Sequence, residues 1–311
     1  MYNIEKTDLA VKSETISTQE FAKALGLEIV FEGRGKITLN SISVSRPGLQ
    51  LAGYFKHFDH NRVQLIGNAE HDYLLSMPKK ERDKNLNELF KSDIPCMIIA
   101  NNLLVLDSLL EYAKKYNCPL LRATQLTTVL SHELTIFQSE LLAPTLIAHG
   151  VLLEVFGVGV LITGKAGIGK SETALDLITR GHRLVADDSV IIRNMGEDLM
   201  GSSPDRIQYF MEVRGIGVIN VQKMYGPGAI RPKKTIDLLI ELVRWDDSQV
   251  YDRLGDIKDN TDVLGIMKPK LTIPVSPGRN IPAIIETAAR KYRLDQDGYD
   301  ATSELLKRTF R

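Results

Sequence analysis

The sequence has few cysteines, no net charge and no long apolar run. Only Cys96 and Cys118 are present among its 311 residues. This count excludes a disulfide framework and a multi-cysteine zinc site, and it suits a reducing compartment. We expect both thiols to be buried apolar groups. The 39 basic side chains balance 39 acidic ones, so the overall field does not attract nucleic acid or anionic lipid, and any anion site must be local.

Segments typical of membrane targeting are also missing. The first six residues mix charges and lack the apolar region of a signal peptide. The most apolar stretch, 151–162, contains Glu154 and is shorter than the roughly 18–20 residues that a membrane span needs. We therefore expect a cytoplasmic protein with neither a membrane nor a nucleic acid as partner.

The length predicts two domains, of which the first is a small α/β domain over residues 1–133. Residues 17–20, Ser-Thr-Gln-Glu, form a capping box, with Ile16 and Phe21 as a hydrophobic staple and Gly26 at the helix end. Further on, 95–100 and 120–123 are typical of buried strands, and 106–116 has helical spacing. A helical segment over 125–142 leads to Pro144 and is expected to connect to the second domain, 134–311.

Three histidines of the first domain, His57, His60 and His71, have no metal-type cluster around them in the sequence. We interpret all three as isolated surface residues.

The second domain contains a phosphate-binding pattern. Residues 164–171 match G-x-x-x-x-G-K-[ST] at every fixed position, between a strand–turn–strand pattern over 151–162 and a helical pattern over 172–180. Glycines let backbone N–H groups converge on phosphate oxygens, and the helix N-terminus adds partial positive charge. The nucleotide-binding candidates are Gly164, Lys165, Ala166, Gly167, Ile168, Gly169, Lys170 and Ser171. The alternative is a glycine-rich turn without a ligand.

Within this pattern, Lys170 would reach the β- and γ-phosphates and the Ser171 hydroxyl would bind Mg²⁺. Sixteen residues after Ser171, the apolar segment 184–186 ends in Asp187 and Asp188. A second metal ligand or a catalytic base is expected at such a position, whereas a lone pair of aspartates usually marks a solvated turn.

Residues 211–220, Met-Glu-Val-Arg-Gly-Ile-Gly-Val-Ile-Asn, resemble the signature segment of the bacterial HPr kinase/phosphorylase family. Together with the phosphate loop, 186–188, 251–255 and 274–280, the resemblance spans the C-terminal half. It implies an α/β fold whose catalytic domain is similar to phosphoenolpyruvate carboxykinase. The implied activity is phosphorylation of a regulatory serine of the phosphocarrier protein HPr with ATP or pyrophosphate, and dephosphorylation by phosphorolysis to pyrophosphate, in carbon catabolite regulation.

The resemblance also implies Mg²⁺ as cofactor, a homohexamer and fructose 1,6-bisphosphate as effector, and it leaves open whether Crh is an additional substrate. By the same resemblance, Asp188 accepts the serine proton in phosphorylation and returns it in the reverse reaction, which microscopic reversibility allows. Asp187 is kept as a supporting carboxylate, because the sequence alone does not separate the two neighbours.

Other positions match the family's site residues. Glu212 resembles a second Mg²⁺ ligand beside Ser171, and Arg214, one side-chain repeat further along a strand, is expected to contact phosphate. His149 and Arg253 match active-site residues. The segment implicated mainly in dephosphorylation comprises Pro274, Val275, Ser276, Pro277, Gly278 and Arg279. Without the resemblance, these residues would be read as a structural histidine, surface charges and an ordinary turn.

Two further segments invite interpretation. The basic run 231–234, Arg-Pro-Lys-Lys, is either a contact for an acidic effector or protein substrate, or a solvated loop. Residues 281–293 place Ile281, Ile284, Ile285 and Ala288 on one helical face, which we expect to pack on a neighbouring subunit.

Two other functions remain open from the residues alone. The phosphate loop by itself would equally suit an ATP-dependent kinase of a small metabolite. A nucleotide-sensing regulator that transfers nothing is the second alternative.

Overall fold

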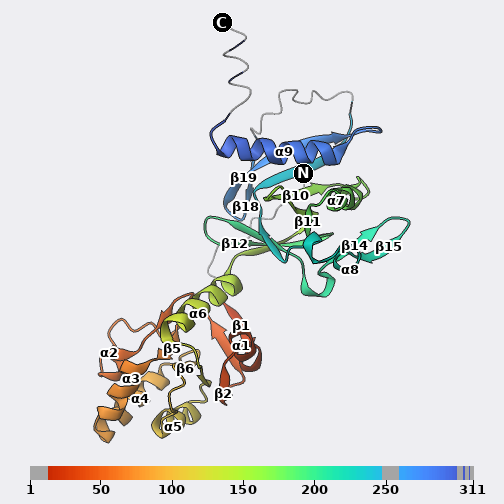
Figure 1. Ribbon diagram of the computed structural model, residues 1–311. Coiled ribbons are helices and arrows are strands. Elements are labelled where there is room, and N and C mark those ends of the chain that lie inside the picture. Colours follow the sequence, from red (N-terminus) through yellow and green to blue (C-terminus); the bar gives the residue numbers. More distant parts are fainter. Residues whose placement is uncertain (1–12, 247–258, 300–303, 305–307, 309–311) are drawn as a thin grey trace. The chain divides into compact units, whose positions relative to one another are not determined.

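The computed structural model describes residues 13–246, 259–299, 304 and 308 (Figure 1). Contacts divide the chain into two compact units between Ala143 and Pro144, and each unit is described by itself. Arg253 and the segment 251–255 lie outside the described residues.

The N-terminal unit is built on a five-stranded sheet in the order β2-β7-β6-β5-β4. The strands β4 (Val44–Ser45), β5 (Val63–Ile66), β6 (Met97–Ile99) and β7 (Leu120–Arg122) run parallel, and β2 (Glu28–Phe31) pairs antiparallel with β7. One apolar cluster joins the sheet to α2 (Gly48–Leu51), α3 (Asn68–Ser76), α4 (Lys79–Lys91) and α5 (Asp107–Lys115). A second cluster joins it to α1 (Thr18–Leu25), α6 (Thr127–Leu142) and the pair β1 (Glu14–Ser17)–β3 (Lys36–Leu39). The unit therefore has helices on both faces of its sheet, as a largely parallel sheet requires.

The local predictions for this unit are confirmed with one exception. Helix α1 has both halves of the capping box, and Gly26 ends it in the left-handed conformation. Both cysteines are buried. His71, however, is not a surface residue: it is 6% exposed, and its Nε2 lies 2.9 Å from Leu104 O. Its place on the inner side of α3 was not evident from a sequence with weak helical periodicity there.

The expected domain boundary between residues 133 and 134 falls inside α6. Leu130, Leu134 and Leu142 of this helix belong to the apolar cluster of the N-terminal unit, and the division by contacts lies ten residues further on.

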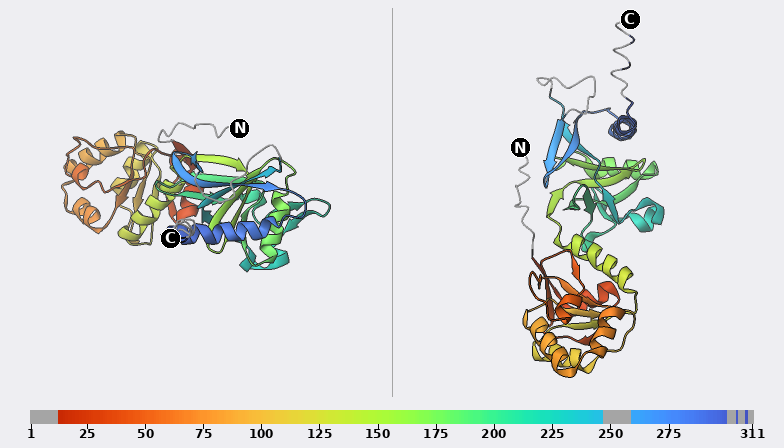
Figure 2. Two further views of the ribbon diagram at one scale, coloured as in Figure 1. Left: turned by 90° about the horizontal axis from the view of Figure 1, so that it is seen from above. Right: turned by 90° about the vertical axis from the view of Figure 1, so that its left-hand side faces the viewer.

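The C-terminal unit has three layers. Its central sheet has the strand order β11-β9-β10-β17-β19-β18, formed by β9 (Val151–Val155), β10 (Val158–Gly164), β11 (Arg183–Ala186), β17 (Leu238–Arg244), β18 (Asp259–Val263) and β19 (Ile266–Val275). Helices α7 (Lys170–Thr179) and α9 (Ile281–Gln296) pack on one face. A four-stranded sheet, β16-β13-β12-β8, covers the other face (Figure 2); it contains β8 (Thr145–His149), β12 (Ser189–Asn194), β13 (Leu199–Ser202) and β16 (Lys233–Thr235).

The remaining elements follow β13 in the chain. They are η1 (Asp205–Ile207), the hairpin β14 (Phe210–Val213)–β15 (Gly217–Asn220), α8 (Val221–Tyr225) and η2 (Pro227–Ala229). In Figure 1 the hairpin projects from the side of the unit near α7.

The predicted strand–turn–strand over 151–162 is confirmed as β9 and β10, whose turn residues Phe156 and Gly157 both have positive φ. The prediction for the C-terminal helix is wrong in one respect. The apolar face of α9, with Ile281, Ile285 and Ala288, is buried in this chain's own core and not against a neighbouring subunit. The reason is that the apolar face of the six-stranded sheet must be covered by another layer. Within the described part of the chain, no helix combines the length and hydropathy of a membrane span.

Candidate active site

The phosphate loop leaves the sheet beside two other segments. Gly164 of β10 is in register with Leu242 of β17, and Leu242 is in register with Ile273 of β19. These three strands are parallel, so the segments that follow them emerge at one edge of the sheet. The carboxyl edge of parallel strands is the usual place for ligand sites in α/β folds.

Two glycines of the loop are required by its conformation. Gly164 has φ +144°, and a Cβ there would lie 2.5 Å from Leu242 O. Gly167 has φ +77°, and a Cβ there would lie 3.1 Å from the guanidinium nitrogens of Arg214. Gly169 then precedes α7, whose N-terminus has no side-chain cap. The loop therefore presents backbone N–H groups at an uncapped helix N-terminus, which favours an anion.

The lysine and serine of the loop are held from within the unit. The Lys170 side chain is buried, and its Nζ donates to Gly164 O at 3.0 Å and to Lys165 O at 3.4 Å. Ser171 Oγ donates to Asp187 Oδ1 at 3.0 Å. Helix α7 packs against the neighbouring strands β9 and β11. The end of β11 therefore lies directly beside the start of the helix.

Asp187 and Asp188 have different environments. Asp187 is 5% exposed, and its Oδ2 accepts from Glu212 N–H at 3.2 Å. Burial raises the pKa of the Asp187 carboxyl, although the hydrogen bonds from Ser171 and Glu212 oppose the rise. Asp187 thus joins the phosphate loop to the hairpin β14–β15.

The Asp188 side chain is 70% exposed, and its backbone φ is +64°, a conformation that costs energy for a residue with a Cβ. His149 Nδ1 lies 3.0 Å from Asp188 Oδ1. The register of β8 with β12 pairs His149 with Ser189, the residue after Asp188. This pairing of two distant segments is why the sequence alone shows no link between the histidine and the carboxylate.

The hairpin brings two more predicted residues to the loop. Glu212 and Arg214 are both exposed, while Met211 and Val213 between them are buried in the core. The alternation confirms that Glu212 and Arg214 face the same side. Glu212 is positioned through its backbone contact with Asp187, and Arg214 lies against Gly167.

The segment 274–279 is partly strand. Pro274 and Val275 are the last residues of β19, so the expected loop begins at Ser276. Arg279 Nη1 donates to Pro274 O at 2.8 Å, and its guanidinium lies 6.0 Å from the centre of the Trp245 ring. Trp245, whose backbone N–H donates to Val275 O at 3.0 Å, was not among the predicted residues. The signal that could have found it is the apolar run 238–243, which forms the strand beside the phosphate-loop strand.

The donor set suits a hard cation that is also bound by phosphates. Ser171, Asp187 and Glu212 supply a hydroxyl and carboxylates, the oxygen ligands that Mg²⁺ prefers. No group of three or more histidine, cysteine, aspartate or glutamate side chains among the described residues could hold a metal by itself. A bound Mg²⁺ would therefore take its other ligands from phosphate oxygens and water, as Mg²⁺ usually does.

The basic run 231–234 is largely neutralised. Arg231 Nε lies 3.1 Å from Glu154 Oε2, and Lys234 Nζ lies 3.7 Å from Asp237 Oδ2. These ion pairs favour a structural role for the run.

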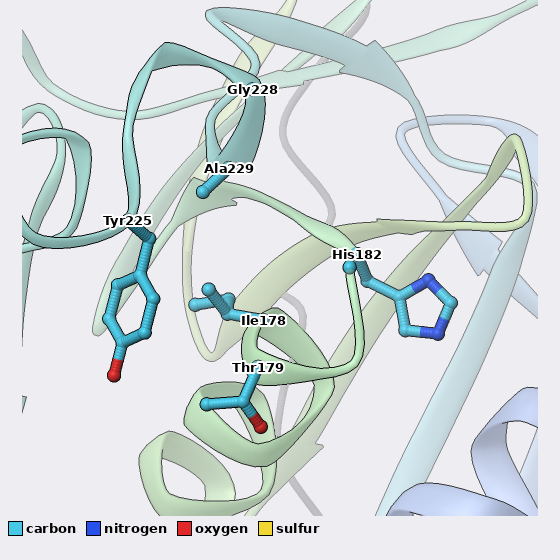
Figure 3. Close-up of a pocket in the computed structure, with 7 residues that line it drawn as sticks. Ile178, Thr179, His182, Tyr225, Gly228 and Ala229 are labelled. Atoms are coloured by element: carbon cyan, nitrogen blue, oxygen red, sulfur yellow. The ribbon is translucent and has the colours of Figure 1, made fainter.

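A pocket of about 340 Å³ lies at the far end of α7 from the phosphate loop (Figure 3). It is lined by Ile178, Thr179, Gly181, His182, Tyr225, Gly228 and Ala229. The imidazole of His182 points away from Tyr225 and Ile178 in Figure 3, toward its contact with Glu286 Oε1 at 3.0 Å. The ten residues of α7 span about 15 Å, so this pocket is separate from the candidate site.

Comparisons with known proteins cover almost the whole chain. Residues 140–309 match the model of the HPr serine kinase C-terminal domain, and residues 16–137 match that of the HPr serine kinase N terminus. A protein named HPr kinase/phosphorylase from Caldanaerobacter subterraneus is 43% identical over 95% of this chain and 97% of its own length. Proteins of the same name from Peptoclostridium acidaminophilum and Bacillus cereus are each 42% identical, over 96% and 94% of this chain and 98% and 96% of their own. The chain therefore belongs to the HPr serine kinase family.

Proposed function

We propose that this protein transfers the γ-phosphoryl group of ATP to a serine of HPr, and removes that group by phosphorolysis. The observation that carries the proposal is one cluster at the carboxyl edge of the central sheet. There, the phosphate loop meets a buried carboxylate, Asp187, and an exposed carboxylate, Asp188, with a histidine beside it. Family membership adds the substrate.

The environments of the two carboxylates support a division of labour. A base must reach the serine hydroxyl of a protein, and Asp188 is accessible whereas Asp187 is not. In phosphorylation, Asp188 takes the proton as the serine oxygen bonds to the γ-phosphorus and the bond to ADP breaks. His149 orients the carboxylate through the 3.0 Å contact between its Nδ1 and Asp188 Oδ1.

The reverse reaction uses the same groups in the opposite sense. An oxygen of inorganic phosphate bonds to the phosphorus of phosphoserine, the bond to the serine oxygen breaks, and pyrophosphate forms. Protonated Asp188 returns its proton to the serine oxygen. Lys170 of the loop and Arg214 beside it carry positive charges, which stabilise the negative charge on the phosphate oxygens in both directions.

A divalent cation bound near Ser171 would neutralise phosphate charge in this reaction. Asp187 orients the serine hydroxyl that would bind it, and Glu212 is the second predicted ligand. Arg253, the remaining predicted catalytic residue, stays a prediction from the resemblance.

The direct test incubates the purified protein with HPr and Mg²⁺-ATP, then adds excess inorganic phosphate and measures pyrophosphate. We expect phosphoserine to form and then to disappear with stoichiometric pyrophosphate. Phosphorylation without pyrophosphate would leave a plain kinase. If neither reaction occurs, the result favours a nucleotide sensor. Transfer to a small metabolite alone would favour a metabolite kinase.

The variant Asp188→Ala distinguishes an enzyme from a nucleotide sensor that transfers nothing. We expect the variant to bind ATP normally and to lose transfer, because the loop is intact and the base is absent.

Family membership implies three properties that remain predictions: a homohexamer, stimulation by fructose 1,6-bisphosphate, and Crh as an additional substrate. A cytoplasmic location, expected from the composition and the missing targeting segments, also remains a prediction. Sedimentation would test the assembly, kinase assays with the sugar bisphosphate and with Crh the next two, and cell fractionation the last.

A further inference from the structure

The hairpin β14–β15 has one face in the core and one face outside. Met211 and Val213 are 1% and 5% exposed and belong to the main apolar cluster. Phe210 and Glu212 therefore point the other way, since successive side chains of a strand alternate. The hairpin is anchored by its inner face, and its outer face is available to a partner.

The outer face is more apolar than an ordinary exposed hairpin. Val218 lies directly opposite Glu212 across the two strands, so their side chains share a face. Val218 is 70% exposed, Ile216 in the turn is 73% exposed, and Phe210 is 43% exposed. Single exposed apolar residues are common, but three on one eleven-residue hairpin, 210–220, form a patch of the kind that marks protein contacts.

This patch is continuous with the candidate site. Asp187 accepts hydrogen bonds from both Ser171 of the loop and the backbone of Glu212. Arg214, at the end of β14, lies against Gly167. The cross-strand neighbour of a predicted metal ligand is thus an exposed valine. A protein whose serine reaches the phosphate loop must lie over or beside this hairpin.

We propose that the outer face of the β14–β15 hairpin, with Val218 on β15 and Ile216 in the turn, is a docking surface for the protein substrate. This inference rests on the proposed function, and its occupant is HPr. Complementarity then requires an apolar surface on the substrate next to the acceptor serine. Apolar contacts beside a polar reaction centre distinguish one serine from the many others that a phosphate loop alone would accept.

The test measures KM and kcat for HPr at saturating ATP with Val218→Ser, Ile216→Ser and the double variant. Because both side chains are exposed, the substitutions should leave the circular dichroism spectrum and melting temperature unchanged. We expect the double variant to raise KM for HPr about tenfold, the range of a central apolar interface contact, with kcat changed less than twofold. Nucleotide affinity, measured by titration, should match the wild type.

The reverse direction gives a second readout. Docking is common to both reactions, so KM for phosphorylated HPr in phosphorolysis should rise by the same factor. The matched control is Met267→Ser, which removes a 59%-exposed apolar side chain from β19 of the same unit and should leave both KM values unchanged.

Three results would overturn the proposal. Unchanged KM in the double variant would remove the docking role, and a fall in kcat at constant KM would make the residues part of the chemistry. A changed sedimentation coefficient of the double variant would make the patch a contact between copies of this chain. If the wild-type protein does not phosphorylate HPr at all, the proposed function itself fails, and the docking surface with it.

Discussion

Both units place a glycine between a parallel strand and the helix that follows, but they treat the N-terminus of that helix differently. In the N-terminal unit, β5 leads through Gly67 into α3, where Glu70 Oε2 accepts from Gly67 N–H at 3.0 Å and from Arg46 Nη2 at 2.7 Å. In the C-terminal unit, β10 leads through the phosphate loop into α7, which has no side-chain cap.

A helix N-terminus attracts negative charge in either case. The N-terminal unit supplies the anion from its own chain, and its neighbouring polar groups bond to one another: Asn101 Nδ2 donates to Asn68 Oδ1 at 2.9 Å and to Thr127 Oγ1 at 3.2 Å. The C-terminal unit leaves the place for a phosphate. The same backbone plan thus ends in a contact with the chain's own carboxylate in one unit and in an uncapped helix N-terminus in the other.

The largest expected effect comes from the open helix N-terminus. Lys170→Ala should lower kinase turnover by about 10³-fold or more and weaken ATP binding, because the contact with the β- and γ-phosphates is lost. Steady-state kinetics and nucleotide titration would measure this. Lys84→Ala on α4 of the other unit should have no effect on either quantity, and unchanged turnover in Lys170→Ala would refute the role of the lysine.

A smaller effect is expected at Arg279, in the segment that follows β19. Arg279→Ala should slow phosphorolysis about tenfold or more while phosphorylation falls much less, because the family resemblance assigns 274–279 mainly to dephosphorylation and a guanidinium suits the extra phosphate. Both directions should be assayed, with Arg180→Ala at the far end of α7 as control. Equal losses in the two directions would contradict a direction-specific segment.

At the N-terminus of α3, where Glu70 contacts Gly67, a substitution should change the stability of the protein and not its activity. Burial alone would raise the pKa of Glu70, but hydrogen bonds from Arg46 and Gly67 lower it overall. Glu70→Ala should therefore reduce the free energy of unfolding by about 1–3 kcal/mol, leaving kcat unchanged. Glu81→Ala, an exposed acid in the first turn of α4, is the matched control.

The same lowered pKa gives a sign to the acid dependence. Ionised Glu70 stabilises the fold above its ordinary pKa of 4.5, and this contribution is lost as the pH falls through the lower folded-state value. Urea titrations should show that Glu70→Ala loses less stability than the wild type between neutral and acid pH. Parallel losses would contradict the assignment.

An effect confined to alkaline pH concerns the two thiols, which lie only in the N-terminal unit. Burial raises the pKa of Cys118 from 9.0 to about 12 and also raises that of Cys96. Unfolded thiols lose protons first, so stability is retained below pH 9 and falls as the pH rises toward 12, by about 1.4 kcal/mol per pH unit per thiol. Unfolding curves at pH 8 and 10 would measure this, and Cys118→Ala should show a weaker dependence. Rapid reaction of native thiols with a disulfide reagent at pH 8 would contradict their burial.

Local sequence signals predicted what local interactions determine. The capping box of α1, the strand–turn–strand of β9 and β10 and the helix that follows the loop 164–169 each depend on neighbouring residues, and each is confirmed. Contacts across many residues were not predictable in the same way. The pairing of His149 with Asp188 depends on the register of β8 with β12, and the contact of Arg279 with the Trp245 ring depends on the pairing of β17 with β19. The burial of α9 within its own unit likewise depends on a sheet that the sequence did not outline.

The strand order of the central sheet also sets the sequence of events during synthesis. The phosphate-loop strand β10 pairs on one side with β9, which precedes it, but on the other with β17, whose first pair joins Val160 to Leu238. The ribosome must therefore add nearly eighty residues before this strand has both neighbours, and β19 comes later still. The N-terminal unit, in contrast, is one continuous stretch that is complete by Ala143. Since domains fold as units during translation, the N-terminal unit is able to finish folding before the strands of the C-terminal unit have all their partners.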